Sequence, residues 1–238
     1  MTSSLSGFDD WLNRMLEKCA RDAGQSVKAY VTRAVATQMV ADQRRTDENA
    51  PIEELMAHLK ECGALTATEM PDVETEISDP ARLQALHATG LLDSPPEEVY
   101  DRITRAAAAA LDAPAASLTL VDVDRQFFKS TVGMKIESAQ DRQTPLSRSV
   151  CQYAVANGAP LIIGDARVDP VFRHHPAVLD GMVVAYLGIP LIDRDGNAIG
   201  TLCVFDDKPR LWGTGHIQVL SDLAKLAAER IFSSVQSR

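Results

Sequence analysis

The sequence predicts an α+β protein, in which helices cover a mostly antiparallel sheet and a helical module precedes this domain. Apolar stripes at helical spacing and short strand-like runs alternate through residues 80–238. Two pairs of these runs are separated by short polar turns, which is typical of hairpins. Residues 8–40 carry helical stripes alone. Hairpins inside and helices outside favour a layered α+β domain.

The composition is that of a folded protein. Of the 238 residues, 45% are hydrophobic and 24% are charged, which excludes a wholly disordered chain. No apolar run reaches the length of about 18 residues that a transmembrane helix needs, so no membrane contact is expected. Residues 1–7 lack the basic and apolar regions of a signal peptide. The four cysteines are scattered, with no Cys-x-x-Cys pair, and we expect a cytoplasmic protein in a reducing environment.

Charge divides the chain into three parts. The net charge is −9, which disfavours general DNA binding by the whole chain. Residues 1–46 carry seven Lys or Arg and five acidic residues, whereas residues 47–79 carry one Lys and ten acidic residues. Residues 80–238 are nearly balanced. We therefore predict a helical module over 1–46, an acidic linker with a short helix near 51–63, and a larger domain over 80–238.

Two apolar stripes mark the N-terminal module. The first runs from Phe8 to Cys19 and the second from Val27 to Met39. Two helices of this size cannot bury both stripes by themselves, and a second copy of the same pair is the simplest partner. We therefore expect a homodimer through residues 8–40. The predicted dimer contacts are Trp11, Leu12, Met15, Leu16, Tyr30, Val31 and Val35.

The second stripe resembles the helix-helix part of ribbon-helix-helix proteins. The match is Gly24-x-Ser26-Val27-x-x-Tyr30-Val31-x-x-Ala34-Val35. In that family a strand before the first helix reads the DNA major groove, whereas residues 2–7 here have no basic residue and no alternating pattern. We expect this module to serve dimerisation. A DNA-binding transcriptional regulator remains an alternative that is not favoured.

The helices expected in the larger domain follow from apolar spacing and capping patterns. Residues 83–92 form one helical face. Residues 94–97, Ser-Pro-Pro-Glu, read as a capping Ser94, first-turn prolines and a capping-box glutamate for a second helix that ends near Leu111. A final amphipathic helix begins near Gly215.

Strands are expected where apolar residues alternate with polar ones or form short runs between turns. The polar segments 122–125 and 193–197 each join two such runs, so two hairpins are predicted. The expected strands are residues 117–121, 126–132, 160–163, 183–192 and 198–205.

The larger domain resembles the GAF sensor domain family. The motifs that carry the resemblance occur in the family's order and lie in residues 82–98, 120–130, 145–151, 160–172 and 195–206. The resemblance implies a six-stranded antiparallel sheet with helices on one face. It also implies a ligand pocket on the other face, walled by the loops and short helices of about 133–186. Members of the family bind cyclic nucleotides, haem, bilins, metabolites or no known ligand, so a GAF domain that serves only as a scaffold is a further alternative.

The residues do not single out one of these ligands. The Asn-Lys…Phe…Asp-Glu signature of cyclic-nucleotide GAF domains is absent, and Cys151 is followed by Gln152 instead of the histidine of bilin-binding members. His174 and His175 read as parts of an exposed loop, which disfavours haem. No metal-spaced His/Cys cluster and no catalytic arrangement stands out. The cofactor stays unknown, no metal is expected, and the chain is not expected to be an enzyme.

Cys151 is the candidate redox residue. It lies after Ser147, Arg148 and Ser149, where a helix start and a cation lower a thiol pKa; the other reading is a buried apolar side chain. Cys203 reads as strand core. A thiol enzyme of the free methionine sulfoxide reductase type is an alternative that needs a cysteine pair within reach. The candidate pocket residues are Phe128, Arg148, Cys151, Asp165, Asp169, Phe172 and Tyr186.

Asp165 and Asp169 allow two readings. Their spacing of four residues suits paired carboxylates, but Ala166 and Pro170 favour turn and cap positions. The function expected from the sequence is therefore a dimeric sensor. It binds an unidentified small molecule or senses redox state, and it passes the signal to a partner protein, because no output domain is evident in the sequence.

Overall fold

The computed structural model describes residues 9–22, 27–28, 30–32, 34–35, 39, 70–135, 137–138, 140–169 and 171–235. Its contacts divide the chain into two compact units, of which the first comprises 1–69 with 168–171 and the second comprises 70–167 with 172–238. The predicted division into three domains stays a prediction.

Both predicted N-terminal helices are present in the described residues of the first unit. Helix α1 spans Asp10–Asp22, and the described residues between Val27 and Met39 are helical. In the single chain the side chains of Trp11 and Val35 are 58% and 52% exposed. Dimerisation through these stripes stays a prediction. The segments expected to form a DNA-reading strand (2–7) and a linker helix (51–63) lie outside the described residues.

The described residues of the second unit contain a six-stranded antiparallel sheet, which confirms the predicted fold class. The strand order is β3-β2-β1-β6-β5-β4. Both predicted hairpins are present, as β1–β2 and β5–β6. The sequence missed β3, which has three residues and so shows no period. The strands are β1 (Ala115–Val121), β2 (Arg125–Val132), β3 (Gln143–Pro145), β4 (Leu161–Ile163), β5 (Ala185–Ile192) and β6 (Ala198–Asp206).

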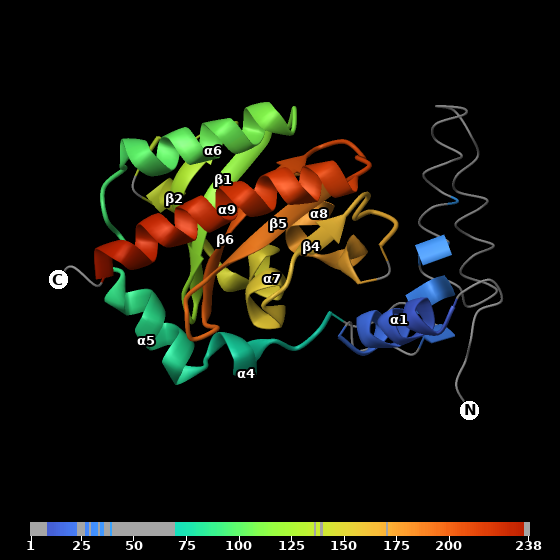
Figure 1. Cartoon of the computed structure of the whole chain (residues 1–238). Helices are drawn as coiled ribbons and strands as arrows, with labels where there is room; N and C mark the ends of the chain where they lie inside the picture. The colour runs from blue at the N-terminus through green and yellow to red at the C-terminus, as the bar shows by residue number, and fades with distance from the viewer. Residues whose placement is uncertain are drawn as a thin grey trace. The chain divides into compact units, whose positions relative to one another are not determined.

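Helices lie on both faces of this sheet. The α-helices are α4 (Glu74–Ile77), α5 (Pro80–Ala88), α6 (Glu98–Ala110), α7 (Cys151–Asn157), α8 (Pro176–Leu179) and α9 (Thr214–Val235). Short 3-10 helices are η1 (Gln140–Arg142), η2 (Leu146–Arg148) and η3 (Phe172–His174). Helices α6 and α9 lie side by side over one face, and α7 packs against β1, β5 and β6 (Figure 1). Among the described helices, none combines the length and apolar content needed to cross a bilayer.

Alternation along the strands gives the sheet an apolar face and a polar face. In β6, Leu202 and Val204 belong to the apolar core with residues of α5, α6 and α9, whereas Cys203 between them does not. Neighbouring residues of a strand point to opposite sides, so Cys203 faces α7. Ser117 in β1 likewise stands between two residues of the core. The fully buried core includes Leu86, Ala107, Leu118, Leu120, Leu187, Leu191, Ile199, Leu202, Leu220 and Ile231.

The prediction that Ser94 caps α6 is wrong. Helix α6 begins at Glu98, and its N-cap Glu97 makes no side-chain capping bond. The ammonium of the fully buried Lys129 donates to Ser94 Oγ at 2.6 Å and to the Pro95 carbonyl at 2.7 Å. Lys129 also pairs with Glu97 at 2.7 Å. This lysine holds the segment before α6 in place. It donates to the Pro95 carbonyl, which would accept a backbone amide if the helix began earlier.

Replacing Lys129 with methionine should destabilise the domain. Lys129→Met keeps most of the apolar stem but leaves the Pro95 carbonyl and Ser94 hydroxyl without their donor. We expect the free energy of unfolding to fall by about 1–3 kcal/mol, as for loss of a partner to buried polar groups. Urea unfolding measures the change, with the exposed Lys208→Met as the control. Equal stability of the two variants would show that the buried lysine contributes nothing.

Candidate functional site

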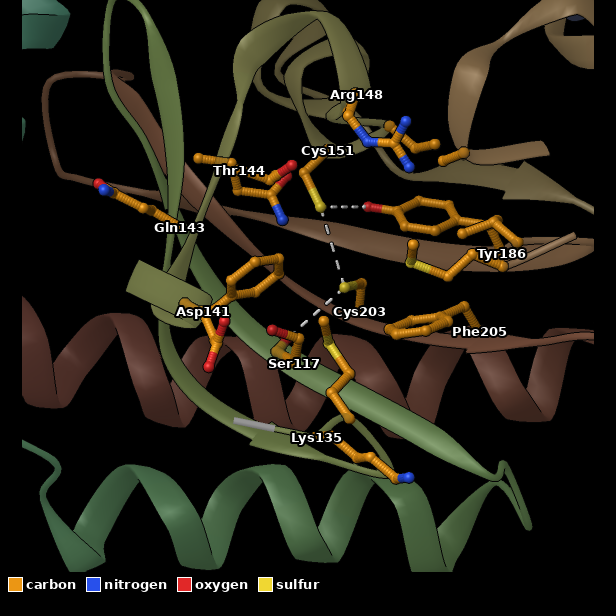
Figure 2. Close-up of a pocket in the computed structure, with 17 residues that line it drawn as sticks. Ser117, Lys135, Asp141, Gln143, Thr144, Arg148, Cys151, Tyr186, Cys203 and Phe205 are labelled. Atoms are coloured by element: carbon orange, nitrogen blue, oxygen red, sulfur yellow. Dashed lines mark hydrogen bonds between the residues drawn. The ribbon is translucent and has the colours of Figure 1, made fainter. Parts of the chain in front are cut away.

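A cavity of about 260 Å³ lies on the polar face of the sheet. Its floor comes from β1, β2, β5 and β6, and its walls come from the segment after β2, from η2 and α7, and from α8 and the residues that follow it. Figure 2 shows the labelled side chains around this space. The lining residues are Ser117, Gln126, Phe128, Met134, Lys135, Asp141, Gln143, Thr144, Arg148, Val150, Cys151, Ala177, Met182, Val183, Tyr186, Cys203 and Phe205.

Two thiols and a phenol form a hydrogen-bonded chain in this cavity. The Sγ atoms of Cys151 and Cys203 are 3.9 Å apart. The Tyr186 hydroxyl donates to Cys151 Sγ at 3.2 Å, and the Cys203 thiol donates to the Ser117 carbonyl at 3.5 Å (Figure 2). Cys151 is the first residue of α7, as the sequence predicted for a residue in the first turn of a helix.

Of the two thiols, Cys151 is the one that ionises more readily. Hydrogen bonds from Cys203, and also from Thr201 and Tyr186, stabilise its thiolate and lower its pKa to about 6, although burial opposes this. The same contact with Cys151, together with burial, raises the pKa of Cys203 well above its ordinary value. Burial likewise raises the pKa of Tyr186, which keeps this phenol protonated as a donor.

Gly188 makes room for the Tyr186 ring. The two residues lie on the same side of β5, and Gly188 pairs with Cys203 across the sheet. A Cβ atom at Gly188 would lie 2.2 Å from Tyr186 Oη and 2.6 Å from two ring carbons. The absence of a side chain at this position therefore allows the phenol to lie along the strand and reach Cys151.

Three charged side chains are among the lining residues of the cavity. Lys135 and Arg148 are cationic, and Arg148 pairs with Asp180. Asp141 is the carboxylate of this lining, and it accepts hydrogen bonds from the Ser138 hydroxyl at 2.9 Å and from the Ser138 amide at 2.7 Å. Bonds from Ser138 lower the pKa of Asp141. Among the lining side chains, the two cations thus face two groups that carry negative charge at neutral pH, the Asp141 carboxylate and the Cys151 thiolate.

The structure brings together four of the seven predicted pocket residues. Phe128, Arg148, Cys151 and Tyr186 line the cavity. The other three, which are Asp165, Asp169 and Phe172, are not part of its lining.

Asp165, Asp169 and Phe172 make local contacts. The Asp165 carboxylate accepts hydrogen bonds from Nε and Nη2 of Arg167, both at 2.9 Å. Asp169 accepts the Val171 amide at 2.8 Å, which is a turn contact. The Phe172 ring packs edge-on against Tyr153, with ring centroids 5.2 Å apart.

Cys203 is the functional candidate that sequence reasoning missed. It was expected to be strand core, and it is buried as expected, but it also lines the cavity and contacts Cys151. The available signal was alternation, because Leu202 and Val204 take the core face and leave Cys203 on the other side.

The expectation of an exposed His175 is wrong. Its side chain is 1% exposed, and its Nδ1 accepts the Ala177 amide at 3.2 Å at the start of α8. The ring packs against Tyr153 and Phe172. Burial lowers the pKa of His175, and the nearby Arg148 adds to this effect, so the imidazole is neutral at pH 7.

Comparison with known proteins identifies this kind of domain. The GAF domain family matches residues 95–231, and the chain belongs to that family. The GAF domain of a phosphoenolpyruvate-protein phosphotransferase from Coxiella burnetii has the same fold, with a TM-score of 0.50 and 19% identity over 66% of this chain and 95% of that one. The corresponding GAF domain from Acinetobacter gives a TM-score of 0.47 and 15% identity over 67% of this chain and 97% of that one.

A curated relative corrects one expectation. A cyclic di-GMP phosphodiesterase of Pseudomonas aeruginosa is 34% identical over 144 residues, which cover 60% of this chain and 24% of the relative. The chain thus spans about a quarter of the relative's length. The prediction that the chain is not an enzyme is contradicted by this similarity to part of an enzyme, which covers only the GAF part. Family membership and this relative support a role in signalling.

Removal of the Tyr186 hydroxyl should weaken the ionisation of Cys151. In Tyr186→Phe the thiolate loses one donor, so we expect the Cys151 pKa to rise by about one unit. The rate of alkylation should then fall by about twofold at pH 7 and about tenfold at pH 5, in step with the thiolate fraction. Iodoacetamide labelling followed peptide by peptide over pH 5–10 measures this. Tyr153→Phe removes another buried phenol of the domain and serves as the control. A labelling midpoint for Cys151 near that of an ordinary thiol would contradict the assignment.

Proposed function

We propose that the protein is a sensor in which the cavity of the GAF domain binds a small molecule and passes this state to a partner protein. The observation that carries the proposal is the cavity on the polar face, where aromatic, sulfur-containing and charged side chains converge. The apolar core lies on the other face of the sheet, so a ligand is accommodated without opening that core.

The lining favours a small anionic ligand with an apolar part. The cavity of about 260 Å³ is smaller than the sites of roughly 300–1,000 Å³ that hold drug-sized molecules. Phe128, Tyr186 and Phe205 offer apolar surface, whereas Lys135 and Arg148 offer positive charge. A carboxylate or phosphate group beside either cation suits this lining, because guanidinium and ammonium groups bind such anions.

The ion pair between Arg148 and Asp180 offers a route for the signal. Arg148 ends η2, and Asp180 directly follows α8, so the pair joins two walls of the cavity. An anionic ligand competes with Asp180 for the guanidinium and thereby loosens one wall from the other. We propose that the partner protein, or a second copy bound through the predicted N-terminal stripes, responds to this change. A cytoplasmic location is part of the proposal.

A thiol-dependent enzyme is the second candidate. The specific observation in its favour is the separation of 3.9 Å between Cys151 and Cys203 Sγ, since such an enzyme needs a nucleophilic and a resolving cysteine within reach. Turnover of free methionine sulfoxide by the reduced protein, lost in Cys151→Ser, is the expected result. Absence of turnover in the reduced chain with a thiol reductant present would reject this candidate.

Filling the cavity should abolish ligand binding. Ala177 lines the cavity and is 5% exposed, so Ala177→Leu adds bulk that competes with the ligand. We expect co-purified mass in native mass spectrometry to disappear. The affinity for small carboxylates and phosphate esters, determined from thermal shifts over a range of ligand concentrations, should fall at least about tenfold, or ~1.4 kcal/mol.

The matched control is Ala109→Leu, which places the same bulk on an exposed position of α6. This variant should bind as the unmodified chain does. Equal binding by Ala177→Leu and Ala109→Leu would place the ligand elsewhere, and no binding of any compound by the unmodified chain would contradict the proposed sensor.

A further inference from the structure

Two cysteines that lie 52 residues apart in the chain meet in the cavity. Cys151 opens α7, Cys203 lies in β6, and Figure 2 shows the two side chains pointing toward one another. They are 3% and 2% exposed, yet both line the cavity. A solute small enough to enter the cavity therefore reaches both sulfurs without unfolding of the domain.

The geometry leaves a short path to a covalent bond. A disulfide has an S–S length of about 2.05 Å, and the two sulfurs stand 3.9 Å apart. Rotation of two side chains covers this difference, because each sulfur moves by about half of it. Strand β6 lies inside the sheet between β1 and β5, and α7 packs against it. The two thiols are therefore held as neighbours.

The surroundings give the two thiols different roles. Cys151 accepts a hydrogen bond from Tyr186 and is the readier to ionise, which suits the attacking thiolate. Cys203 keeps its proton, which it shares between the Cys151 sulfur at 3.9 Å and the Ser117 carbonyl at 3.5 Å. The hydroxyls of Thr119 and Thr201, which are 3.0 Å apart, also help to lower the pKa of Cys151.

We propose that Cys151 and Cys203 form a redox-active pair that hydrogen peroxide, or another hydroperoxide small enough for the cavity, converts to an intramolecular disulfide. The Cys151 thiolate attacks the terminal peroxide oxygen; an S–O bond forms, the O–O bond breaks, and the leaving hydroxide takes up one proton to become water, or the leaving alkoxide of another hydroperoxide becomes an alcohol. Cys203 Sγ then attacks the Cys151 sulfenic acid; the S–S bond forms, the S–O bond breaks, and the Cys203 proton leaves in a second water. The two thiols lose the two electrons that the peroxide gains.

This reaction goes beyond the proposed ligand sensing, because bond formation needs no ligand. The disulfide removes the thiolate that accepts from Tyr186, and it ties α7 to β6 across the cavity. The negative charge of the Cys151 thiolate disappears at the same time. Oxidation thus alters the cavity that we propose for the ligand, and it gives the domain a second input.

The test uses the full chain with Cys19 and Cys62 replaced by serine, so that Cys151 and Cys203 are the remaining thiols. The reduced protein is treated with hydrogen peroxide in the absence of any added ligand. We expect both thiols to be lost in parallel, the intact mass to fall by two hydrogens, and a Cys151–Cys203 linked peptide to appear. Dithiothreitol should restore both thiols.

Single variants separate the two roles. Cys203→Ser, or Cys203→Ala if serine disturbs β6, should leave a Cys151 sulfenic acid that dimedone traps, whereas Cys151→Ser should leave Cys203 unmodified. Tyr186→Phe should slow disulfide formation by about tenfold at pH 5 and by only about twofold at pH 7, because a rise of one unit in the Cys151 pKa lowers the thiolate fraction by about these factors. Circular dichroism confirms the fold of each variant.

Three results would overturn the proposal. The first is that both thiols of the two-cysteine protein survive a peroxide treatment that consumes the Cys151 thiol of the Cys203→Ser variant. The second is added oxygen on Cys151 while Cys203 stays free. The third is a disulfide between two chains in place of one within the chain. Because no ligand is present, these results are independent of the cavity-filling experiment.

Discussion

Alternation of side chains across β1, β5 and β6 is the constraint on which the rest of this domain depends. Leu118, Leu187 and Leu202 point to one side and are fully buried with α5, α6 and α9. Burial of each such side chain contributes roughly 1.5–3 kcal/mol, so this face supplies much of the stability. In each of these strands, the residues that alternate with the leucine point to the face covered by α7, where polar and sulfur-containing groups gather. The functional face thus exists because the other face supplies the core.

Much of the fold was predictable because long elements carry a clear period. The β5–β6 hairpin and α9 were found from alternation, turn residues and apolar spacing. Strand β3 has three residues, too few for a period. The start of α6 was misplaced because its cause is distant: Lys129, 34 residues after Pro95, binds the carbonyl that precedes the helix. A local capping pattern contains no information about such a contact.

The site was predictable in part, and mainly through the family resemblance. Phe128, Arg148, Cys151 and Tyr186 line the cavity, whereas Asp165 turns out to pair with its near neighbour Arg167. Loop residues follow no period, so their direction is set by contacts that the sequence does not display. The pairing of Cys151 with Cys203 depends on the packing of α7 onto β6, which places residues 52 positions apart in contact. Strand alternation predicts the face of the sheet on which Cys203 lies, but it does not predict that Cys151 lies beside it.

The division of labour between the two faces of the sheet also bears on how such a domain evolves. Substitutions at Met134, Met182 or Phe205 change the lining of the cavity while the apolar core on the other face stays intact. The ligand specificity of the cavity is therefore able to change during evolution while the domain still folds. A single scaffold is able to diversify into many sensors by exchanging a small set of side chains, which accords with the general independence of fold and function.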